Sequence, residues 1–355
     1  MLVRAARMDD LPALLRLALE AGSGLTSLPA SEEQLERRLQ TVTGSFAGDL
    51  SIADADYLFV LEDDQGQVIG TSGVLAAAGL REPWYSYRRG LTVTASRELD
   101  VYRQQSTLFL TNDLTGASAL CSLFLSLPHR HSLYGRLLSR ARFIHMAEFA
   151  TDFAPRVIAE MRGLSDSLGQ SPFWDSLGRH FFRMDFARAD YLTATGNKSF
   201  IAEMMPRFPL YCCFLSEEAQ AAMGGVHPDS EPALVMLLEE GLQDQGYIDI
   251  FDGGITIEAP FGQIRSIRDS ETLRLAVGIP GEQAQRYLIH NRERADCRMT
   301  AAPGRVADGS LVVTSETAEC LQLSAGSHVR AVPLVGVPSD TDPYTVHGCP
   351  PASIK

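Results

Sequence analysis

The sequence of 355 residues lacks several features that would assign a class of protein at once. Its six cysteines are scattered and form no C-x-x-C pair, so neither a zinc site nor a disulfide framework is indicated. No apolar run approaches the ~20 residues of a membrane span. The first residues, MLVRAARMDD, contain no apolar core of a signal peptide. We therefore expect a cytoplasmic protein that has no membrane segment.

Positive charge is also scarce. The formal net charge is -13 and the sequence pI is about 5.1. A protein that binds nucleic acid usually presents a basic surface to the phosphates, so we expect no nucleic-acid partner. Neither G-x-x-x-x-G-K-[ST] nor G-x-G-x-x-G occurs near the basic segment described below, so a P-loop or a Rossmann site has no support there.

Helical patterns occur twice near the N-terminus. Segment 8–22 carries an apolar stripe that we place at Leu11, Leu14, Leu15 and Leu19. Ser31 stands three residues before Gln34, which predicts a capping box at the start of a second helix.

Strand patterns follow these helices. Apolar and β-branched runs predict strands at 2–6, 57–63, 67–79, 106–113, 119–127 and 156–163, with a helix at 136–150. Beyond Asp249, short β-like runs are divided by Gly and Pro. The expected fold class is α/β (α+β), a mixed sheet flanked by helices with a β-rich C-terminal lobe. We place a first domain at 1–200, a C-terminal lobe that completes the active site at 201–335, and a poorly ordered tail at 336–355.

One basic segment stands out against the acidic chain. LPHRHSLYGRLLSRAR, residues 127–142, holds four arginines and leads from a predicted strand into a predicted helix. Such a turn favours anions, because the first N–H groups of a helix lack internal partners. Gly135 would let the backbone approach a ligand, and Arg130 and Arg136 could bond phosphate oxygens. A pyrophosphate fits this chemistry. The alternative is a solvated helix face whose arginines pair with nearby acids.

The stretch from Arg130 to Gly135 resembles the coenzyme A loop of the GNAT superfamily of N-acyltransferases, Q/R-x-x-G-x-G/A, with Leu133 in place of the first glycine. Longer stretches resemble the arginine N-succinyltransferase family, in order along the chain to about residue 335. They are GSGLTSLPA (22–30), LFLTNDLTGASALCSLFL (108–125), VIAEMRG (157–163), SPFWDSLGRHFFRMDFARADYL (171–192), FIAEMMPRFPLY (200–211), GGVHPDS (224–230) and YIDIFDGG (247–254).

This resemblance implies an enzyme that moves a succinyl group from succinyl-CoA to the α-amine of L-arginine in arginine catabolism. It places a proton donor on His227 and a succinyl-CoA contact on Leu125. A histidine titrates near neutrality, so it suits proton transfer. The resemblance assigns the coenzyme A pyrophosphate to the loop that holds Arg130, Gly135 and Arg136. Succinyl-CoA is then a co-substrate, and we expect neither a cofactor nor a metal.

Several alternatives stay open. The acceptor could be ornithine, and some members of the family occur as paired chains, so a homo-oligomer or a paralogous partner chain is open too. The chain could also be a non-catalytic or regulatory subunit, because Leu133 is costly if the loop needs a positive φ there.

Two parts of the substrate site stay unassigned. The acceptor for the arginine guanidinium could be any of four carboxylates, Asp113, Glu160, Asp249 and Asp252. Residues 25–29, LTSLP, either form a substrate-side loop or cap a helix through Thr26 or Ser27.

Overall fold

The computed structural model describes residues 1–22, 25–130, 133–166, 169–186, 188–189 and 204–334. The strands are β1 (Leu2–Ala5), β2 (Asp56–Glu62), β3 (Val68–Leu75), β4 (Ser86–Ser96), β5 (Val101–Thr111), β6 (Ser118–Leu125), β7 (Arg156–Glu160), β8 (Leu210–Tyr211), β9 (Gln243–Ile248), β10 (Ile255–Pro260), β11 (Glu271–Val277), β12 (Gln285–His290), β13 (Arg298–Ala307), β14 (Ser310–Val313) and β15 (His328–Pro333). The helices are α1 (Leu11–Ala21), α2 (Glu32–Ala47), α3 (Tyr134–Glu148), α4 (Pro172–Ser176), α5 (Gly178–Phe182), α8 (Glu217–Ala222), α9 (Glu231–Glu239), α10 (Arg265–Arg268) and α11 (Ser315–Cys320).

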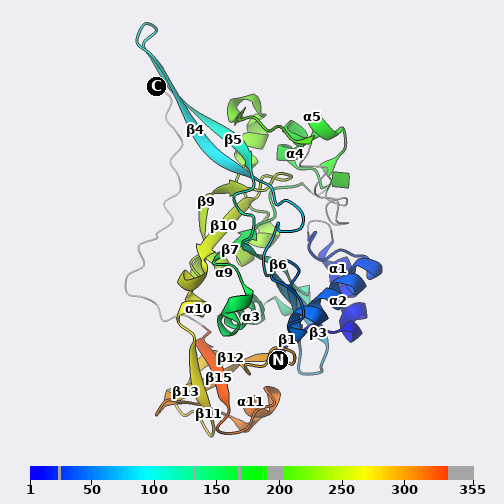
Figure 1. Ribbon diagram of the computed structural model, residues 1–355, viewed down its shortest axis with the longest axis vertical. Coiled ribbons are helices and arrows are strands. Elements are labelled where there is room, and N and C mark those ends of the chain that lie inside the picture. Colours follow the sequence, from blue (N-terminus) through cyan, green and yellow to red (C-terminus); the bar gives the residue numbers. More distant parts are fainter. Residues whose placement is uncertain (23–24, 131–132, 167–168, 187, 190–203, 335–355) are drawn as a thin grey trace.

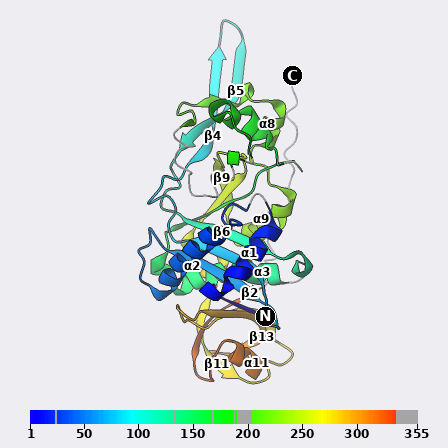
Figure 2. The same cartoon turned by 90° about the vertical axis from the view of Figure 1, so that its right-hand side faces the viewer.

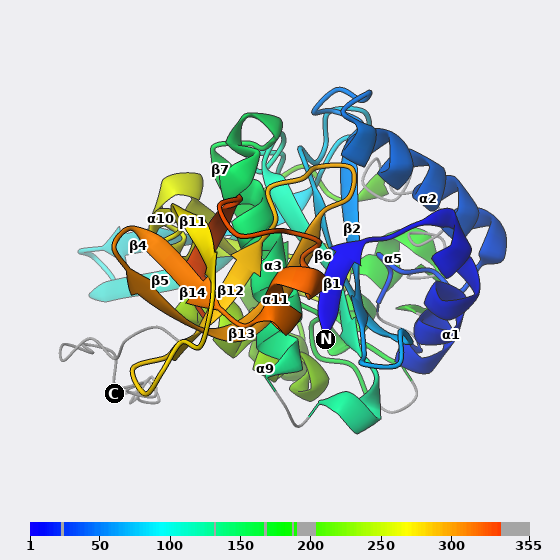
Figure 3. The ribbon, with the colours of Figure 1, turned by 90° about the horizontal axis from the view of Figure 1, so that it is seen from below.

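The described strands join into one sheet of 15 strands, in the order β12-β15-β11-β14-β13-β1-β2-β3-β6-β7-β10-β9-β4-β5-β8. Helices α1 and α2 cover one face of its central part and α3 covers the other (Figures 2 and 3). The sheet is mixed, because β6 pairs with β7, and β11 with β14, in parallel, whereas β1–β2 and β2–β3 are antiparallel. The predicted fold class is confirmed.

Helix α1 turns a different stripe toward the core from the one predicted. Leu14, Leu17 and Ala18 are buried, at the spacing of one helical face. Leu19 is 65% exposed, so its place in the predicted stripe was wrong. Gly22 ends the helix with a φ of 69°, a conformation that glycine adopts without strain.

Helix α2 begins where the sequence predicted but without the predicted capping box. Ser31 is the residue before the first turn, yet its side chain makes no capping hydrogen bond. The helix is held instead by its apolar face, on which Leu35, Leu39, Val42 and Phe46 are buried.

Helix α3 is enclosed on all sides. Every residue from Leu137 to Met146 is buried, including two arginines and a histidine. Buried polar side chains need hydrogen-bond or charge partners from the protein itself. Arg140 does so through Glu240, whose carboxylate lies 2.8 Å from its Nε and is itself fully buried.

The C-terminal strands close into a small barrel. β12 pairs with β15 at one end of the order β12-β15-β11-β14-β13 and with β13 at the other, so the five strands form a ring (Figures 1 and 3). Its interior holds Leu275, Ile289, Leu311 and Val329. The predicted β-rich C-terminal lobe is confirmed. The domain boundary at residue 200 and the tail 336–355 lie outside the described residues, and the division into domains stays a prediction.

A long hairpin projects from the opposite end of the molecule (Figure 1). β4 and β5 pair without interruption from Ser86↔Thr111 to Ser96↔Val101. The sequence predicted only the second half of β5, because the alternation in β4 is largely of polar residues.

Candidate active site

The two parallel strands β6 and β7 separate at the centre of the sheet. They pair only from Ser118↔Val157 to Leu120↔Ala159, after which β6 continues to Leu125. A cavity of about 680 Å³ opens at this point. Its walls come from the loop 25–29, α2, β6, the end of β7, α9 and the segment 249–252, with Trp84, Arg142 and Phe186.

A bulge in β6 shapes one wall of the cavity. The pairing of β3 with β6 shifts between Thr71 and Gly73, and Ser122 has a φ of 52°. The Ser122 N–H donates to Ser27 Oγ at 2.9 Å, and its hydroxyl donates to the Ser27 carbonyl at 2.8 Å. Ser27 therefore ties its loop to the bulge. Because Leu25, Thr26, Ser27 and Pro29 line the cavity, the structure favours the substrate-side loop over helix capping.

Arg38 braces the same wall. Its Nε donates to Asp56 Oδ2 at 2.7 Å and its Nη1 to Ser122 Oγ at 2.8 Å. The Asp56 carboxylate balances its charge, and the pKa of Arg38 is raised because this attraction outweighs the effect of burial. Arg38 is therefore a structural cation of the site.

Three of the four candidate carboxylates line the cavity. Glu160 accepts from Trp84 Nε1 at 3.0 Å, Asp249 from Phe251 N–H at 2.7 Å, and Asp252 from Gly163 N–H at 2.6 Å. Asp113 lies elsewhere, where it accepts from the Tyr247 hydroxyl at 3.0 Å. The fold thus narrows the choice for the guanidinium to the three cavity carboxylates.

His227 lies beside the end of β7. Its backbone N–H donates to the carbonyl of Arg162 at 2.8 Å, and both Arg162 and Ser230, three residues after His227, line the cavity. His227 Nδ1 accepts from Asp229 N–H at 3.2 Å. This bond favours the neutral ring with its proton on Nε2. The pKa of His227 is lowered by burial and by the Arg162 charge, so the ring is neutral at pH 7.

The glycines before His227 fix its path. Gly224 has a φ of 74° and donates its N–H to the Gly253 carbonyl at 2.8 Å. A side chain on Gly225 would come within 3.0 Å of the Ala222 carbonyl. The G-G-V-H block therefore holds the histidine in one place.

The described residues of the predicted coenzyme A loop lie at the end of β6 and the start of α3, and Leu125, Arg130, Gly135 and Arg136 do not line the cavity. Arg130 Nε donates to the Leu125 carbonyl at 2.8 Å, and its guanidinium lies 5.2 Å from the Phe124 ring centre. Leu133 has a φ of −66°, so the loop needs no positive φ there. Gly135 is in the first turn of α3, where a side chain would meet only Met236 at 3.9 Å.

Arg136 is engaged by an acid. Its Nη2 lies 2.9 Å from Glu239 Oε1 and its Nη1 bonds the other oxygen, which raises the pKa of Arg136. The solvated-face alternative expects arginines paired with acids, and Arg136 fits it. Arg140 also pairs with Glu239 and Glu240 but is buried. The roles of Leu125, Arg130, Gly135, Arg136 and His227 toward ligands stay predictions.

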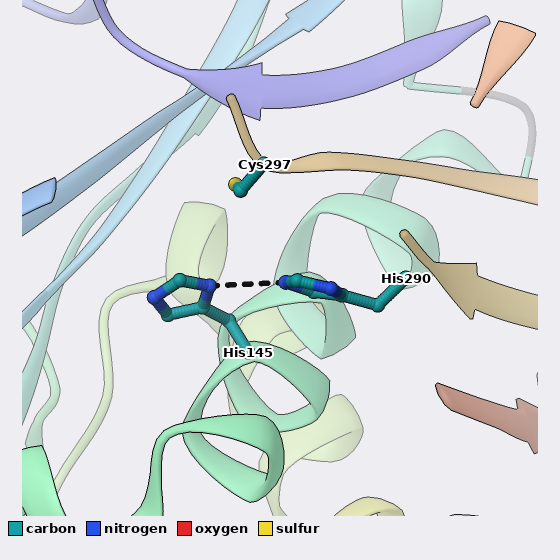
Figure 4. Close-up of side chains that lie close together, drawn as sticks. All are labelled: His145, His290 and Cys297. Carbon is teal, nitrogen blue, oxygen red and sulfur yellow. Dashed lines mark hydrogen bonds between the residues drawn. The ribbon is translucent and has the colours of Figure 1, made fainter. Parts of the chain in front are cut away.

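The fold also assembles a buried trio that no sequence spacing revealed. Ring nitrogens of His145 and His290 and the thiol of Cys297 lie within 4.8 Å of one another (Figure 4). His290 Nδ1 accepts from Arg292 N–H at 2.7 Å, so its Nε2 carries the proton and donates to His145 Nδ1 at 3.1 Å. A metal would need the lone pair that this proton occupies. We therefore assign the two histidines to a structural hydrogen bond.

Comparisons with known proteins decide the family. A family model described as "Arginine N-succinyltransferase beta subunit" matches residues 1–266, and one for its C-terminal domain matches 271–333. The chain is 60% identical to "Arginine N-succinyltransferase subunit beta" of Pseudomonas aeruginosa over 94% of this chain and 98% of that protein. The chain belongs to the arginine N-succinyltransferase family.

Two further members support this assignment. The "Arginine N-succinyltransferase" of Escherichia coli is 45% identical, over 94% of this chain and 98% of its own. The solved structure of "arginine/ornithine succinyltransferase subunit AI from Pseudomonas aeruginosa" matches with a TM-score of 0.86 and 36% identity, over 94% of this chain and 99% of that one. The predicted family and its class, an acyltransferase, are confirmed. Among the described helices, none is long and apolar enough to cross a membrane.

Sequence reasoning missed the residues that form the wall at the bulge. Arg38 lies in no quoted motif, Ser122 was read only as part of the stretch 108–125, and Arg142 was read as one basic residue among four. The signal available for Arg142 was its place in an apolar helical pattern, two residues before Ile144.

Proposed function

We propose that this member of the family transfers succinyl from succinyl-CoA to the α-amine of L-arginine, giving N2-succinyl-L-arginine and coenzyme A. The observation that carries the proposal is the cavity between the separating strands β6 and β7, with His227 held at its edge by Arg162. Family membership supports the choice of substrates.

The start of α3 is the proposed diphosphate site. The N-cap residue Leu133 makes no side-chain capping hydrogen bond, and the N-terminus of a helix favours an anion. Leu133 stands there in an unstrained helical conformation, which supports the enzyme over the non-catalytic subunit. Arg130 adds a cation beside Leu125, the residue for which the resemblance implies a donor contact. Arg136 can join only by exchanging Glu239 for the phosphate.

The pantetheine arm would then follow β6. Beyond Leu120 this strand has no pairing with β7, so its backbone groups on that side can bond the amides of the arm as an added strand would. The thioester would reach the cavity where β6 bulges at Ser122.

The chemistry needs one proton to move. The amine nitrogen attacks the thioester carbon, the C–S bond breaks, and the proton that the amine loses ends on the coenzyme A sulfur. His227 is the group that we assign to the departing sulfur. Its neutral Nε2–H donates a hydrogen bond to the negative charge as it develops, and one such bond typically amounts to ~10²–10³-fold in rate.

The acceptor would extend its guanidinium toward Glu160 and Asp249, since carboxylates match its fork of N–H groups. Ornithine has a shorter chain that ends in an ammonium group, so it would meet the same carboxylates less completely. We therefore propose arginine as the preferred acceptor.

We further propose that the chain works as an oligomer in the cytoplasm. Leu91, Val93 and Tyr102 are exposed on the β4–β5 hairpin, and a two-stranded hairpin gains stability when its apolar side chains are covered. The five described cysteines are free thiols, which fits a reducing compartment. Light scattering of the purified chain tests the first point, since a monomer at micromolar concentration would contradict it.

The test of the reaction is identification of its product. The purified chain is incubated with succinyl-CoA and L-arginine. The products are then separated by chromatography and identified by mass spectrometry. The proposal predicts an arginine adduct heavier by one succinyl group, with the succinyl on the α-nitrogen. A chain that forms no such adduct, or that modifies the guanidinium, contradicts it.

A further inference from the structure

Arg142 is a buried cation without a carboxylate partner. Its side chain is 1% exposed, and it donates to the Ser139 carbonyl and to Ser139 Oγ, each at 3.0 Å. The other buried arginines in the described chain are balanced, Arg4 by Asp10 and Glu62 and Arg140 by Glu239 and Glu240. Arg142 alone among them has only neutral groups around it.

Its neighbour across the wall does not supply the missing charge. The Cys121 thiol lies close enough to influence Arg142, but burial raises the pKa of Cys121, so it stays neutral at pH 7. Burial lowers the pKa of Arg142 to about 10, which still leaves it charged. A buried charge without a counter-ion costs several kcal/mol. An anionic ligand in the cavity would offset this cost.

The cavity gives that ligand access. Arg142 lines it, together with Cys121 and Leu123 of β6. The cavity acids Glu160, Asp249 and Asp252 come from the end of β7 and the segment after β9. Arg37, Arg38 and Arg162 also line the cavity, but Arg37 pairs with Glu33 and Arg38 with Asp56, and Arg162 comes from the segment after β7 and bonds Ser165. Arg142 is therefore the fully buried cation of the lining, and it comes from α3.

Both substrates of the proposed reaction carry a free carboxylate. In succinyl-CoA it is at the far end of the succinyl group, and in arginine it is the α-carboxylate. Arg142 comes from α3, the helix whose first turn is the proposed diphosphate site, about 10 Å away along its axis. Its neighbour Cys121 is on β6, the strand proposed to carry the pantetheine arm. Both elements belong to the donor side.

We propose that Arg142 binds the distal carboxylate of the succinyl group and selects succinyl-CoA over neutral acyl-CoA donors. This inference rests on the proposed function and adds the residue that sets donor specificity. It also gives the buried Arg142 of α3 the anionic partner that the described chain does not supply.

The experiment compares succinyl-CoA with butyryl-CoA, in which a methyl group replaces the carboxylate. The ratio of kcat/KM for the two donors, with L-arginine as acceptor, is measured in wild type, Arg142→Met and Arg142→Lys. The same donors are titrated calorimetrically without acceptor. Replacing an unpaired buried charge with an apolar side chain of similar volume is tolerated, so Arg142→Met is expected to fold.

Arg142→Met should lower the succinyl-to-butyryl ratio by about 10- to 100-fold, the effect of a charged hydrogen bond. Arg142→Lys should retain part of the preference. The matched control is Arg140→Met, which removes an equally buried guanidinium of the same helix that does not line the cavity. Its ratio should equal that of wild type, whatever its stability, because the folded fraction cancels in the ratio.

Three outcomes separate the claims. An unchanged donor ratio and an unchanged difference in donor affinity in folded Arg142→Met overturn the inference. A change in the ratio of arginine to agmatine, which lacks the α-carboxylate, with an unchanged donor ratio also overturns it, since it assigns Arg142 to the acceptor. Wild-type chain that fails to use succinyl-CoA with arginine overturns the proposed function instead.

Discussion

The backbone N–H of His227 donates to the carbonyl of Arg162 at 2.8 Å, just beyond the last residue of β7. This bond joins the G-G-V-H segment to the point where β6 and β7 have separated. It places a neutral imidazole at the edge of the cavity without using either ring nitrogen. The site is thus built from two segments more than 60 residues apart in the chain, residues 157–163 and 224–230.

Replacing His227 with alanine should lower kcat by ~10²–10³-fold and leave the KM for succinyl-CoA nearly unchanged, because a hydrogen bond to the charge that develops on the sulfur acts mainly in the transition state. Initial rates of thiol release at several succinyl-CoA concentrations measure both constants. His180→Ala is the control, since His180 is exposed on α5 and does not line this cavity. Unaltered turnover in His227→Ala would remove the residue from the mechanism.

The coenzyme A loop can be tested by binding alone. Arg130→Ala should weaken coenzyme A binding about 10-fold or more, because a charge-assisted bond to phosphate is lost. Glu239→Gln should strengthen binding, since it releases Arg136 from its acid partner. Isothermal titration calorimetry with coenzyme A gives the dissociation constant of each variant. Arg268→Ala serves as control, because Arg268 pairs with the adjacent Asp269. Equal affinity in wild type and Arg130→Ala would refute the diphosphate assignment.

Glu160 and Asp113 form a matched pair of carboxylates. Each accepts one bond from an aromatic side chain, but only Glu160 lines the cavity. Glu160→Gln should raise the KM for L-arginine by about 10-fold, the cost of a lost charged hydrogen bond. Asp113→Asn should leave this KM unchanged. Steady-state rates at a series of arginine concentrations give the KM of each variant. Equal changes of KM in the two variants would count against Glu160 as a partner of the guanidinium.

The buried histidines predict acid sensitivity of the fold. Burial lowers the pKa of His290 to about 3 and that of His145 well below its ordinary value. The unfolded chain takes up protons on both rings near pH 6.5 and the folded chain does not. The contribution of the two neutral rings to the free energy of unfolding is therefore complete above pH 6.5 and decreases as the pH falls toward 3. Each ring accounts for about 1.4 kcal/mol per pH unit once well below pH 6.5.

Urea unfolding at a series of pH values measures this slope, and carboxylates interfere little between pH 6.5 and 5. The variant with His145→Leu and His290→Leu should flatten the slope in that window. A wild-type free energy of unfolding that stays constant from pH 6.5 to 5 contradicts the neutral assignment.

Sequence patterns predicted the fold best where one periodicity dominated. The strands at the centre of the sheet and the C-terminal lobe followed from apolar runs. Leu19 was misplaced because the leucines of 11–19 fit two overlapping faces, and only packing on the sheet selects Leu14, Leu17 and Ala18. The first strand of the hairpin was missed because most of its residues are exposed on both faces. A strand that packs against no core shows no alternation of apolar and polar residues.

The site could be predicted only in part for a different reason. His227 and the loop before α3 came from motifs that are local in the chain. Arg142, Arg38 and the pair His145–His290 depend on contacts across many residues, such as the bond from Arg38 to Ser122. Local sequence also cannot show that Arg136 has an acid partner on α9, while Arg142 has none among the described residues.

The measurement that tests the central claim most directly is thiol release from succinyl-CoA by the purified chain alone, with L-arginine, L-ornithine and no acceptor in parallel. The account predicts release that depends on an acceptor and is faster with arginine than with ornithine at equal concentration. Absence of acceptor-dependent release from a folded chain that binds succinyl-CoA would contradict it.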